Sequence, residues 1–439
     1  MYQSARRFVL VLALSFFAIN AFAADDPAPS DMTPRKVKKA YQHLLVIGDD
    51  FHVSKGNNMQ SPIFAYYWFG ENFANPDLYT QFTLTTTRIY FIAAYKTERV
   101  FVGVKPLVEH STYAGYRLYK KGYIDRGRSI KGNNAGAGIF IEYNWLRILS
   151  TKITFHPSYH FYRFPLISPN EHKTINLPHD HWQVKPGIEL SLSDVKVTDL
   201  NRVKHGYLFR VEYQYARRIG YGTWYDYDRL VYRERYEGTW IPTMPSGVTE
   251  GIWYKSRVNS THRLYFNAGG YYNFAGGYNL QFDVNGGYFK GVDRNNAEQI
   301  GYFLADNAVM PGYALSEFLH TFYLISRLQI GIPIPFWETR IQPGFNVLYM
   351  PTGNGVIGVG RGAITNQWLV RGYPRRIYTS VSVGLSTKLG NFVPIFIDYA
   401  YGIDALRTKS ATSLYLGRIE RGNHEFRIML VMAFVKNDV

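Results

Sequence analysis

Asp398, in the C-terminal part of the sequence, has a side chain suited to pairing its charge rather than to catalysis. Asp398 stands in a segment where apolar residues alternate with Phe396, Asp398 and Ala400, so its carboxylate is expected on the polar face of a strand. A carboxylate in a partly dry interior needs a partner, and an arginine can bind it bidentately. Arg371 lies in the basic and aromatic stretch NQWLVRGYPRRIY, within a motif made of Val370, Arg371, Gly372 and Tyr373.

The remaining polar clusters do not add up to a catalytic or metal site. His179–Trp182, with the sequence HDHW, lacks a third and fourth ligand nearby. Gly48–His52, with the sequence GDDFH, is interpreted as a turn because no companion motif accompanies its acidic and histidine residues. The glycine-rich Gly353–Gly362 does not join a strand to a helix and so is no phosphate loop. We therefore predict that the protein is not an enzyme and holds no cofactor and no metal ion.

Strands are expected to position these side chains, because apolar and polar residues alternate in many parts of the chain. The pattern is clear in Tyr207–Tyr215, Lys152–Phe161 and Tyr278–Asn285. Such a period of two gives each strand one apolar and one polar face. The predicted strands are 63–69, 79–95, 99–119, 135–146, 150–164, 182–194, 205–219, 224–235, 262–274, 278–290, 319–333, 338–350, 378–389, 392–402, 411–419 and 424–434.

The apolar faces of these strands are rich in Tyr and Phe, and the opposite faces carry Arg, Glu, Gln and Asn. A soluble β-sandwich would instead fill its core with branched aliphatic residues, whereas a membrane barrel needs lipid outside and polar groups inside. Closure removes strand edges that hydrocarbon could not satisfy. We therefore predict an all-β fold, a transmembrane antiparallel β-barrel of about sixteen strands, with fourteen also possible. Its predicted pore lining includes Arg210, Glu212, Arg327, Arg340 and Gln342.

The first residues predict export to the outer membrane of a Gram-negative bacterium. Arg6 and Arg7 precede the apolar run Phe8–Ile19, and Ala21–Ala23 supplies a cleavage site. Residues 1–23 are thus a predicted signal peptide, 24–45 a flexible lead and 46–439 the barrel. The chain has no Cys and a net charge of +16. An exported basic protein is expected to meet outer-membrane lipid and lipopolysaccharide, and the assembly machinery during biogenesis, rather than nucleic acid. The oligomeric state stays open.

The barrel pattern together with Val370–Tyr373 resembles the BamA/TamA superfamily of outer-membrane insertases and two-partner secretion transporters, here as a bacterial surface antigen-like barrel without periplasmic modules. In that family the motif lies on an extracellular loop that folds back into the lumen, and its arginine pairs with the aspartate of an F-x-D-x-G motif. The resemblance implies that Arg371 meets Asp398, next to Phe396, inside the barrel. Met310–Tyr313, with the sequence MPGY, is a second candidate for this loop: it lacks the arginine but precedes five strands if 411–419 is a loop.

Two classes of function follow from these expectations. The first is a barrel that inserts or translocates protein or lipid, with a weak seam between its first and last strands and a loop that plugs the lumen. The second is a passive channel for small solutes that mildly favours anions, because basic residues such as Arg210 and Arg327 line it. The sequence names no substrate for either class.

Overall fold

The fold is known from a computed structural model, and all of its described residues belong to one compact unit, Lys39–Val439. The predicted signal peptide and the motif Val370–Tyr373 lie outside the described residues. Those residues are 40–53, 59–71, 77–110, 118–120, 123–125, 130–163, 177–198, 203–222, 224–228, 252–256, 259–291, 298–301, 308–313, 318–335, 339–351, 376–389, 393–407 and 420–437.

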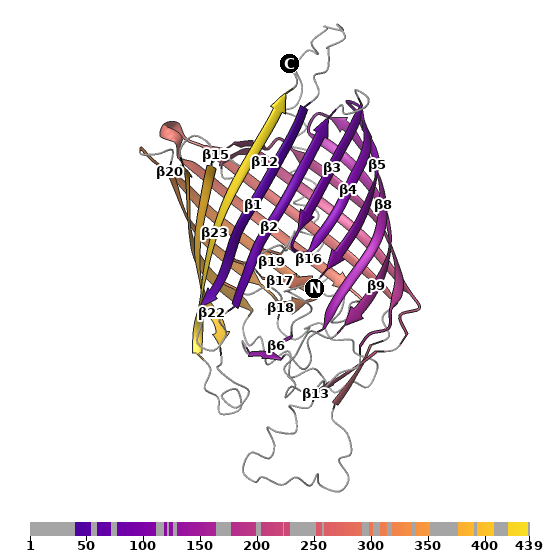
Figure 1. The fold of residues 1–439 in the computed structure, drawn as a ribbon. Coiled ribbons are helices and arrows are strands. Elements are labelled where there is room, and N and C mark those ends of the chain that lie inside the picture. Colours follow the sequence, from indigo (N-terminus) through magenta and orange to yellow (C-terminus); the bar gives the residue numbers. More distant parts are fainter. Residues whose placement is uncertain are drawn as a thin grey trace, which may run out of the picture. The chain divides into compact units, whose positions relative to one another are not determined.

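Within this part of the chain, sixteen antiparallel strands form one closed barrel (Figure 1). They are β1 (Ala40–Val53), β2 (Met59–Glu71), β3 (Leu78–Thr85), β4 (Arg88–Lys96), β5 (Val100–His110), β8 (Lys131–Leu146), β9 (Leu149–Arg163), β10 (His181–Ser193), β12 (Val203–Ile219), β15 (Ser260–Asn273), β16 (Asn279–Lys290), β19 (Phe322–Ile334), β20 (Thr339–Tyr349), β21 (Ile377–Leu389), β22 (Val393–Arg407) and β23 (Glu420–Asn437). The short β11 (Lys196–Thr198) extends β10 along β12.

Three small hairpins lie in the connections between barrel strands. They are β6 (Leu118–Lys120) with β7 (Tyr123–Asp125), β13 (Trp224–Asp228) with β14 (Ile252–Ser256), and β17 (Glu298–Ile300) with β18 (Phe318–His320). Ala275–Gly277 forms a single 3-10 turn, and among the described residues there is no helix long and apolar enough to cross a membrane.

The barrel closes where its first strand pairs with its last (Figure 1, indigo beside yellow). This closing seam, between β1 and β23, runs the full length of β1, from Ala40 opposite Asn437 to Val53 opposite His424. The other barrel strands pair with the strands that precede and follow them in the sequence. The closing seam is therefore as continuous as its neighbour, the β1–β2 pairing, which runs from Ala40 opposite Glu71 to His52 opposite Met59.

Side chains divide between the two barrel faces as the alternation predicts. Large apolar side chains are exposed on the outside, for example Ile141, Ile188, Phe282, Phe345, Ile397 and Leu430. Polar side chains are buried on the inside, for example Asn133, Gln183, Gln281, Asp283, Gln342 and Asn346. An apolar exterior around a polar interior is what a barrel needs in a bilayer. The predicted fold class is thereby confirmed.

The two ends of the barrel differ. Both chain ends of the barrel, Ala40 and Asn437, lie at the end where neighbouring strands join through short turns, such as Arg147–Ile148 between β8 and β9. We call this the short-turn end. The opposite, long-loop end is where strands are joined by the longer connections, which span 111–130, 164–180, 220–259, 291–321, 350–376 and 408–419.

Several predicted strands differ from the observed ones. Strand β1 was not predicted, and it begins inside the segment 24–45 that was expected to be a flexible lead. The GDDFH sequence, interpreted as a turn, is part of this strand. The predicted strand 79–95 is two strands, β3 and β4, and of 224–235 only Trp224–Asp228 is a described strand, in a hairpin outside the barrel sheet. The predicted strand 411–419 lies outside the described residues.

Candidate functional site

The connection between β16 and β19 enters the barrel interior at the long-loop end. Its hairpin β17–β18 and its segment Ala308–Tyr313, which we call the luminal segment, bury apolar side chains against inward-facing residues of the wall. From the connection come Ile300, Ala308, Met310, Tyr313 and Phe318; from the wall come Tyr265, Phe289, Tyr323, Ile325, Leu348, Met350, Tyr378 and Ala405. This apolar core anchors the luminal segment, because burying these side chains removes them from water.

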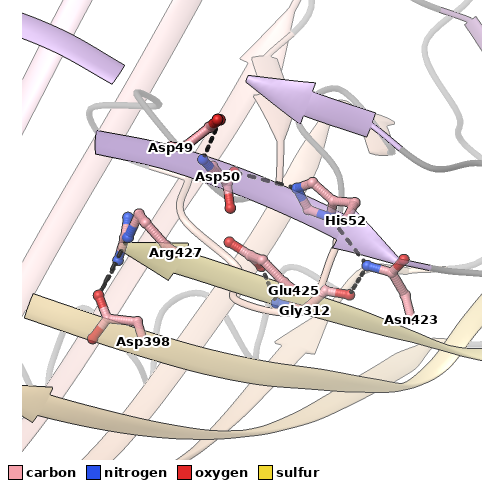
Figure 2. A network of polar contacts seen from close by, with 8 residues as sticks. All are labelled: Asp49, Asp50, His52, Gly312, Asp398, Asn423, Glu425 and Arg427. Atoms are coloured by element: carbon pink, nitrogen blue, oxygen red, sulfur yellow. Dashed lines mark hydrogen bonds and ion pairs between the residues drawn. The ribbon is translucent and has the colours of Figure 1, made fainter. Parts of the chain in front are cut away.

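Gly312 is the point where the luminal segment meets the last two strands. Its N–H donates to Oε2 of Glu425 at 2.7 Å, and its carbonyl accepts from Nδ2 of Asn423 at 3.0 Å (Figure 2). Its φ of +84° favours glycine, and a Cβ here would lie 2.5 Å from the backbone nitrogen of Gly402 on β22. Tyr313 adds a hydrogen bond from its hydroxyl to the carbonyl of Thr379, at 2.9 Å.

Inward-facing residues of β22, β23 and β1 stand in rows beside this contact. The register places Arg427 of β23 between Asp398 of β22 and Asp50 of β1. Arg427 donates to Oδ2 of Asp398 from Nε at 3.2 Å and from Nη2 at 2.7 Å, and both side chains are about 15% exposed (Figure 2). A second row holds His52 of β1 directly opposite Glu425 of β23.

Four buried side chains connect the closing seam to the luminal segment. Nε2 of His52 lies 3.3 Å from Oδ2 of Asp50. Nδ1 of His52 lies 3.2 Å from Nδ2 of Asn423, which also donates to Gly312 (Figure 2). Asp50, His52, Asn423 and Glu425 are each at most 4% exposed. We call them, together with Gly312, the seam network, since they tie β1, β23 and the luminal segment together.

A cavity of about 150 Å³ opens beside the seam network. Pro311, Asp398, Glu425 and Arg427 line it, together with Arg327 of β19 and Asn346 of β20. The cavity is therefore part of the lumen. Charged side chains and the luminal segment border it.

The structure places the predicted site residues as follows. Val370, Arg371, Gly372 and Tyr373 lie outside the described residues, so the pairing of Arg371 with Asp398 stays a prediction. Asp398 faces the lumen with Phe396 and Ala400 on the same side of β22, and its described partner is Arg427. The second loop candidate, Met310–Tyr313, folds into the lumen, and in the described part of the chain five barrel strands, β19 to β23, follow it.

The predicted lining residues alternate with outward apolar ones and so face inward. Gln342 is 3% exposed, and Arg340 donates to the carbonyl of Gly277 at 2.9 Å at the short-turn end. Arg327 lies opposite Asn346 and Asp283 in the register. Glu212 accepts from Gln214, and Arg210 lies two residues before it on the same face of β12.

Sequence reasoning wrongly interpreted Asp50 and His52 as part of a turn, and it missed Asn423, Glu425 and Arg427. The alternation in β23 was used only for its apolar face, from Phe426 onward. The same alternation places Asn423, Glu425 and Arg427 on the inward face, so the signal was present for these three residues.

Sixteen closed antiparallel strands with an apolar exterior and a polar lumen define a transmembrane β-barrel of the outer-membrane type. No protein-family model matches the chain, and no curated protein matches it. Solved structures do. BamA from Haemophilus ducreyi, lacking POTRA domains 1-3, aligns at TM-score 0.53 and 11% identity, covering 91% of this chain and 71% of that chain.

Two further solved structures align less closely. CdiB from Acinetobacter baumannii has a TM-score of 0.48 and 10% identity, covering 90% of this chain and 60% of that chain. OprB from Pseudomonas putida has a TM-score of 0.42 and 7% identity, covering 90% of this chain and 94% of that chain. The chain thus spans about 60% of the length of the CdiB chain. At these identities the likeness to BamA concerns the fold, and at that level it confirms the predicted resemblance.

Proposed function

We propose that this protein is an outer-membrane barrel that inserts or translocates protein or lipid, in the manner implied by its resemblance to the BamA/TamA superfamily. The observation that carries the proposal is the luminal segment, which is pinned through Gly312 to Glu425 and Asn423 and precedes five strands. The family resemblance implies an inward-folded loop at this place. Met310–Tyr313 then takes the role first expected of Val370–Tyr373.

The protein is proposed to work at the outer membrane after export, with its short-turn end toward the periplasm and its long-loop end outside. Support comes from the usual asymmetry of such barrels, which have short periplasmic turns and longer extracellular loops. Outer-membrane lipid, lipopolysaccharide and the assembly machinery are its proposed partners. The proposed activity is not enzymatic.

The continuous closing seam bears on how such an activity would work. A barrel that releases cargo sideways must break backbone hydrogen bonds between β1 and β23, which are paired along the full length of β1. We therefore propose that the resting state is sealed and that the seam opens only when a partner or cargo strand replaces these hydrogen bonds. This modifies the expectation of an intrinsically weak seam.

Two measurements on purified protein test the proposal. In planar bilayers a barrel with a docked luminal segment should stay mostly closed, with brief openings. In liposomes it should speed the folding of a urea-denatured second outer-membrane barrel beyond the rate in empty liposomes. A large, steady conductance without any acceleration of folding would reject the proposal.

The alternative is a passive channel, and the inward-facing Arg210, Arg327 and Arg340 are the observation that favours it. Such a channel would show a steady conductance that rises with salt. Its reversal potential in a salt gradient would show that anions permeate more readily than cations, because basic residues raise the local anion concentration.

A further inference from the structure

Two buried carboxylate oxygens in the seam network accept no hydrogen bond from a donor among the described residues. They are Oδ1 of Asp50 and Oε1 of Glu425, and both side chains are 1% exposed. One ligand atom from each of Asp50, His52 and Glu425 can be chosen so that all three lie within 4.8 Å of one another. Figure 2 shows the two carboxylates facing each other from β1 and β23. A buried carboxylate oxygen without a partner is costly, so this pair calls for a positively charged ligand.

The other oxygen of each carboxylate is already engaged. Oε2 of Glu425 accepts from the N–H of Gly312, and Oδ2 of Asp50 lies 3.3 Å from Nε2 of His52. These contacts fix the orientation of both carboxylates. These two oxygens are therefore held in place on either side of one spot, and no donor from the described part of the chain lies between them.

Hydrogen bonding also decides the role of His52. Nδ2 of Asn423 donates to the carbonyl of Gly312, so it is the amide nitrogen that also faces Nδ1 of His52. Nδ1 must then accept, and the proton of the neutral ring is on Nε2, which lies 3.3 Å from Oδ2 of Asp50. A protonated Nε2 cannot bind a metal ion. His52 is thus a positioning residue that holds Asp50, and the ligands are oxygens.

The local charges favour a divalent cation. Beside the carboxylates of Asp50 and Glu425 stand Asp398 and Arg427, which pair with each other, and Arg327 lines the adjoining cavity. The carboxylates of Asp50 and Glu425 are left facing each other at close range in a buried place. Like charges so close repel strongly in a low-dielectric interior, and a divalent ion between them would neutralise both.

We propose that Asp50 and Glu425 bind a divalent cation of the magnesium or calcium class across the closing seam. Such hard cations prefer oxygen ligands, and magnesium is commonly held by one or two carboxylates while it keeps several waters. The cavity of about 150 Å³ beside Glu425 has room for those waters, each of which takes about 30 Å³ in the liquid.

The position of the ion gives it a structural effect. It joins β1 to β23 and, through Glu425, holds Gly312 of the luminal segment. Bound cation therefore keeps the closing seam shut and the luminal segment docked, and its removal loosens both. This inference does not depend on the proposed insertion activity, because a channel with the same network would bind the ion equally.

Binding is tested with the purified full-length mature protein in detergent micelles free of lipopolysaccharide. Titration calorimetry with magnesium chloride alone, and then calcium chloride alone, should show one site in the unsubstituted protein. A folded barrel migrates faster on a detergent gel than an unfolded one. The heating temperature above which this fast migration is lost should rise with the cation and fall with a chelator. At a cation concentration 100 times the dissociation constant, the unfolding equilibrium constant should drop about a hundredfold.

Matched variants locate the site. Asp50→Asn and Glu425→Gln keep the side-chain shape and remove a charge, so each should weaken binding at least tenfold and abolish the shift in unfolding temperature. The control is Asp49→Asn, on the same strand but on the outward face, where Asp49 contacts Gln60. It should bind the cation as the unsubstituted protein does.

Two outcomes would overturn the proposal. If the unsubstituted protein neither binds nor is stabilised by either cation, the two carboxyl groups share a proton instead, and stability would then follow pH and ignore the chelator. If the unsubstituted protein binds the cation, and Asp50→Asn and Glu425→Gln bind it with the same affinity as the unsubstituted protein, the site lies elsewhere. The titration of the unsubstituted protein decides the first question even where a variant does not fold.

Discussion

Gly312→Val offers the sharpest test of the docked luminal segment. Valine at a φ of +84° costs about 1–2 kcal/mol, since its Cβ crowds the following carbonyl. The new Cβ would also lie 2.5 Å from the nitrogen of Gly402, so the segment must move away from β22. That movement breaks the 2.7 Å hydrogen bond to Glu425, which is worth about 1.5–3 kcal/mol because the acceptor is charged.

These terms together disfavour the docked position by roughly 2.5–5 kcal/mol. Since every 1.4 kcal/mol is about tenfold in an equilibrium, the docked population should fall by at least about sixtyfold relative to the undocked one. Strand pairing around the barrel does not involve Gly312, so the barrel itself should stay closed and keep its fast gel migration. The expected result is a higher and steadier conductance in planar bilayers.

The matched control is Gly220→Ala, because Gly220 also has a positive φ, +82°, but nothing lies within 4 Å of the place that the alanine methyl group would occupy. It should lose a little stability and leave the conductance unchanged. If Gly312→Val conducts like the unsubstituted protein while its gel migration shows a folded barrel, the luminal segment does not obstruct the lumen. The reasoning from Gly312 to function would then be wrong.

Three further outcomes are expected. Asp398→Ala and Arg427→Ala should each lower the free energy of unfolding by about 1.5–3 kcal/mol, since each removes a charged hydrogen-bonded pair, and the double variant should lose less than the sum of the two. Urea unfolding in detergent measures this. Simple additivity would mean that the pair contributes nothing. Arg371→Ala should raise conductance, and non-additively with Asp398→Ala, if Arg371 enters the lumen; a silent Arg371→Ala would leave the luminal role to the Met310–Tyr313 segment. Intact mass of the exported protein should correspond to a chain that begins at Ala24, whereas a mass that includes residues 1–23 would contradict the predicted signal peptide.

The fold class could be predicted from the sequence because alternation is local information, carried by each strand by itself. Strand positions were harder to predict where the turn chemistry was unusual. The turn between β3 and β4 contains no Gly, Pro, Asn or Asp, and it is closed instead by Thr85, whose hydroxyl oxygen accepts from the N–H of Arg88 at 2.9 Å. Strand β1 was missed because Leu44–Ile47 is a continuous apolar run and Asp49–Asp50 suggested a turn.

The candidate site was only partly predictable for a different reason. The inward direction of Asp398 follows from its own strand, and the Met310–Tyr313 candidate followed from counting strands after it. The partner of Asp398, however, depends on the register between β22 and β23, which side-chain period alone leaves open. The seam network depends on a register between the two ends of the chain, and no local pattern can supply that.

The closing seam also determines the order in which the molecule can be made. His52 and Asn423 meet across it although 371 positions separate them, while the other barrel pairings join strands that are consecutive in the barrel. Pairings between consecutive strands can form as hairpins, whereas the closing seam has to wait until the last strand is present, and so distant a contact forms slowly. Until then the sheet has two open edges that invite wrong pairing. A chain that ends before β23 should therefore persist as an aggregation-prone open sheet. The joining of β1 to β23 is then the one late event by which quality control in the cell could distinguish closed barrels from incomplete ones.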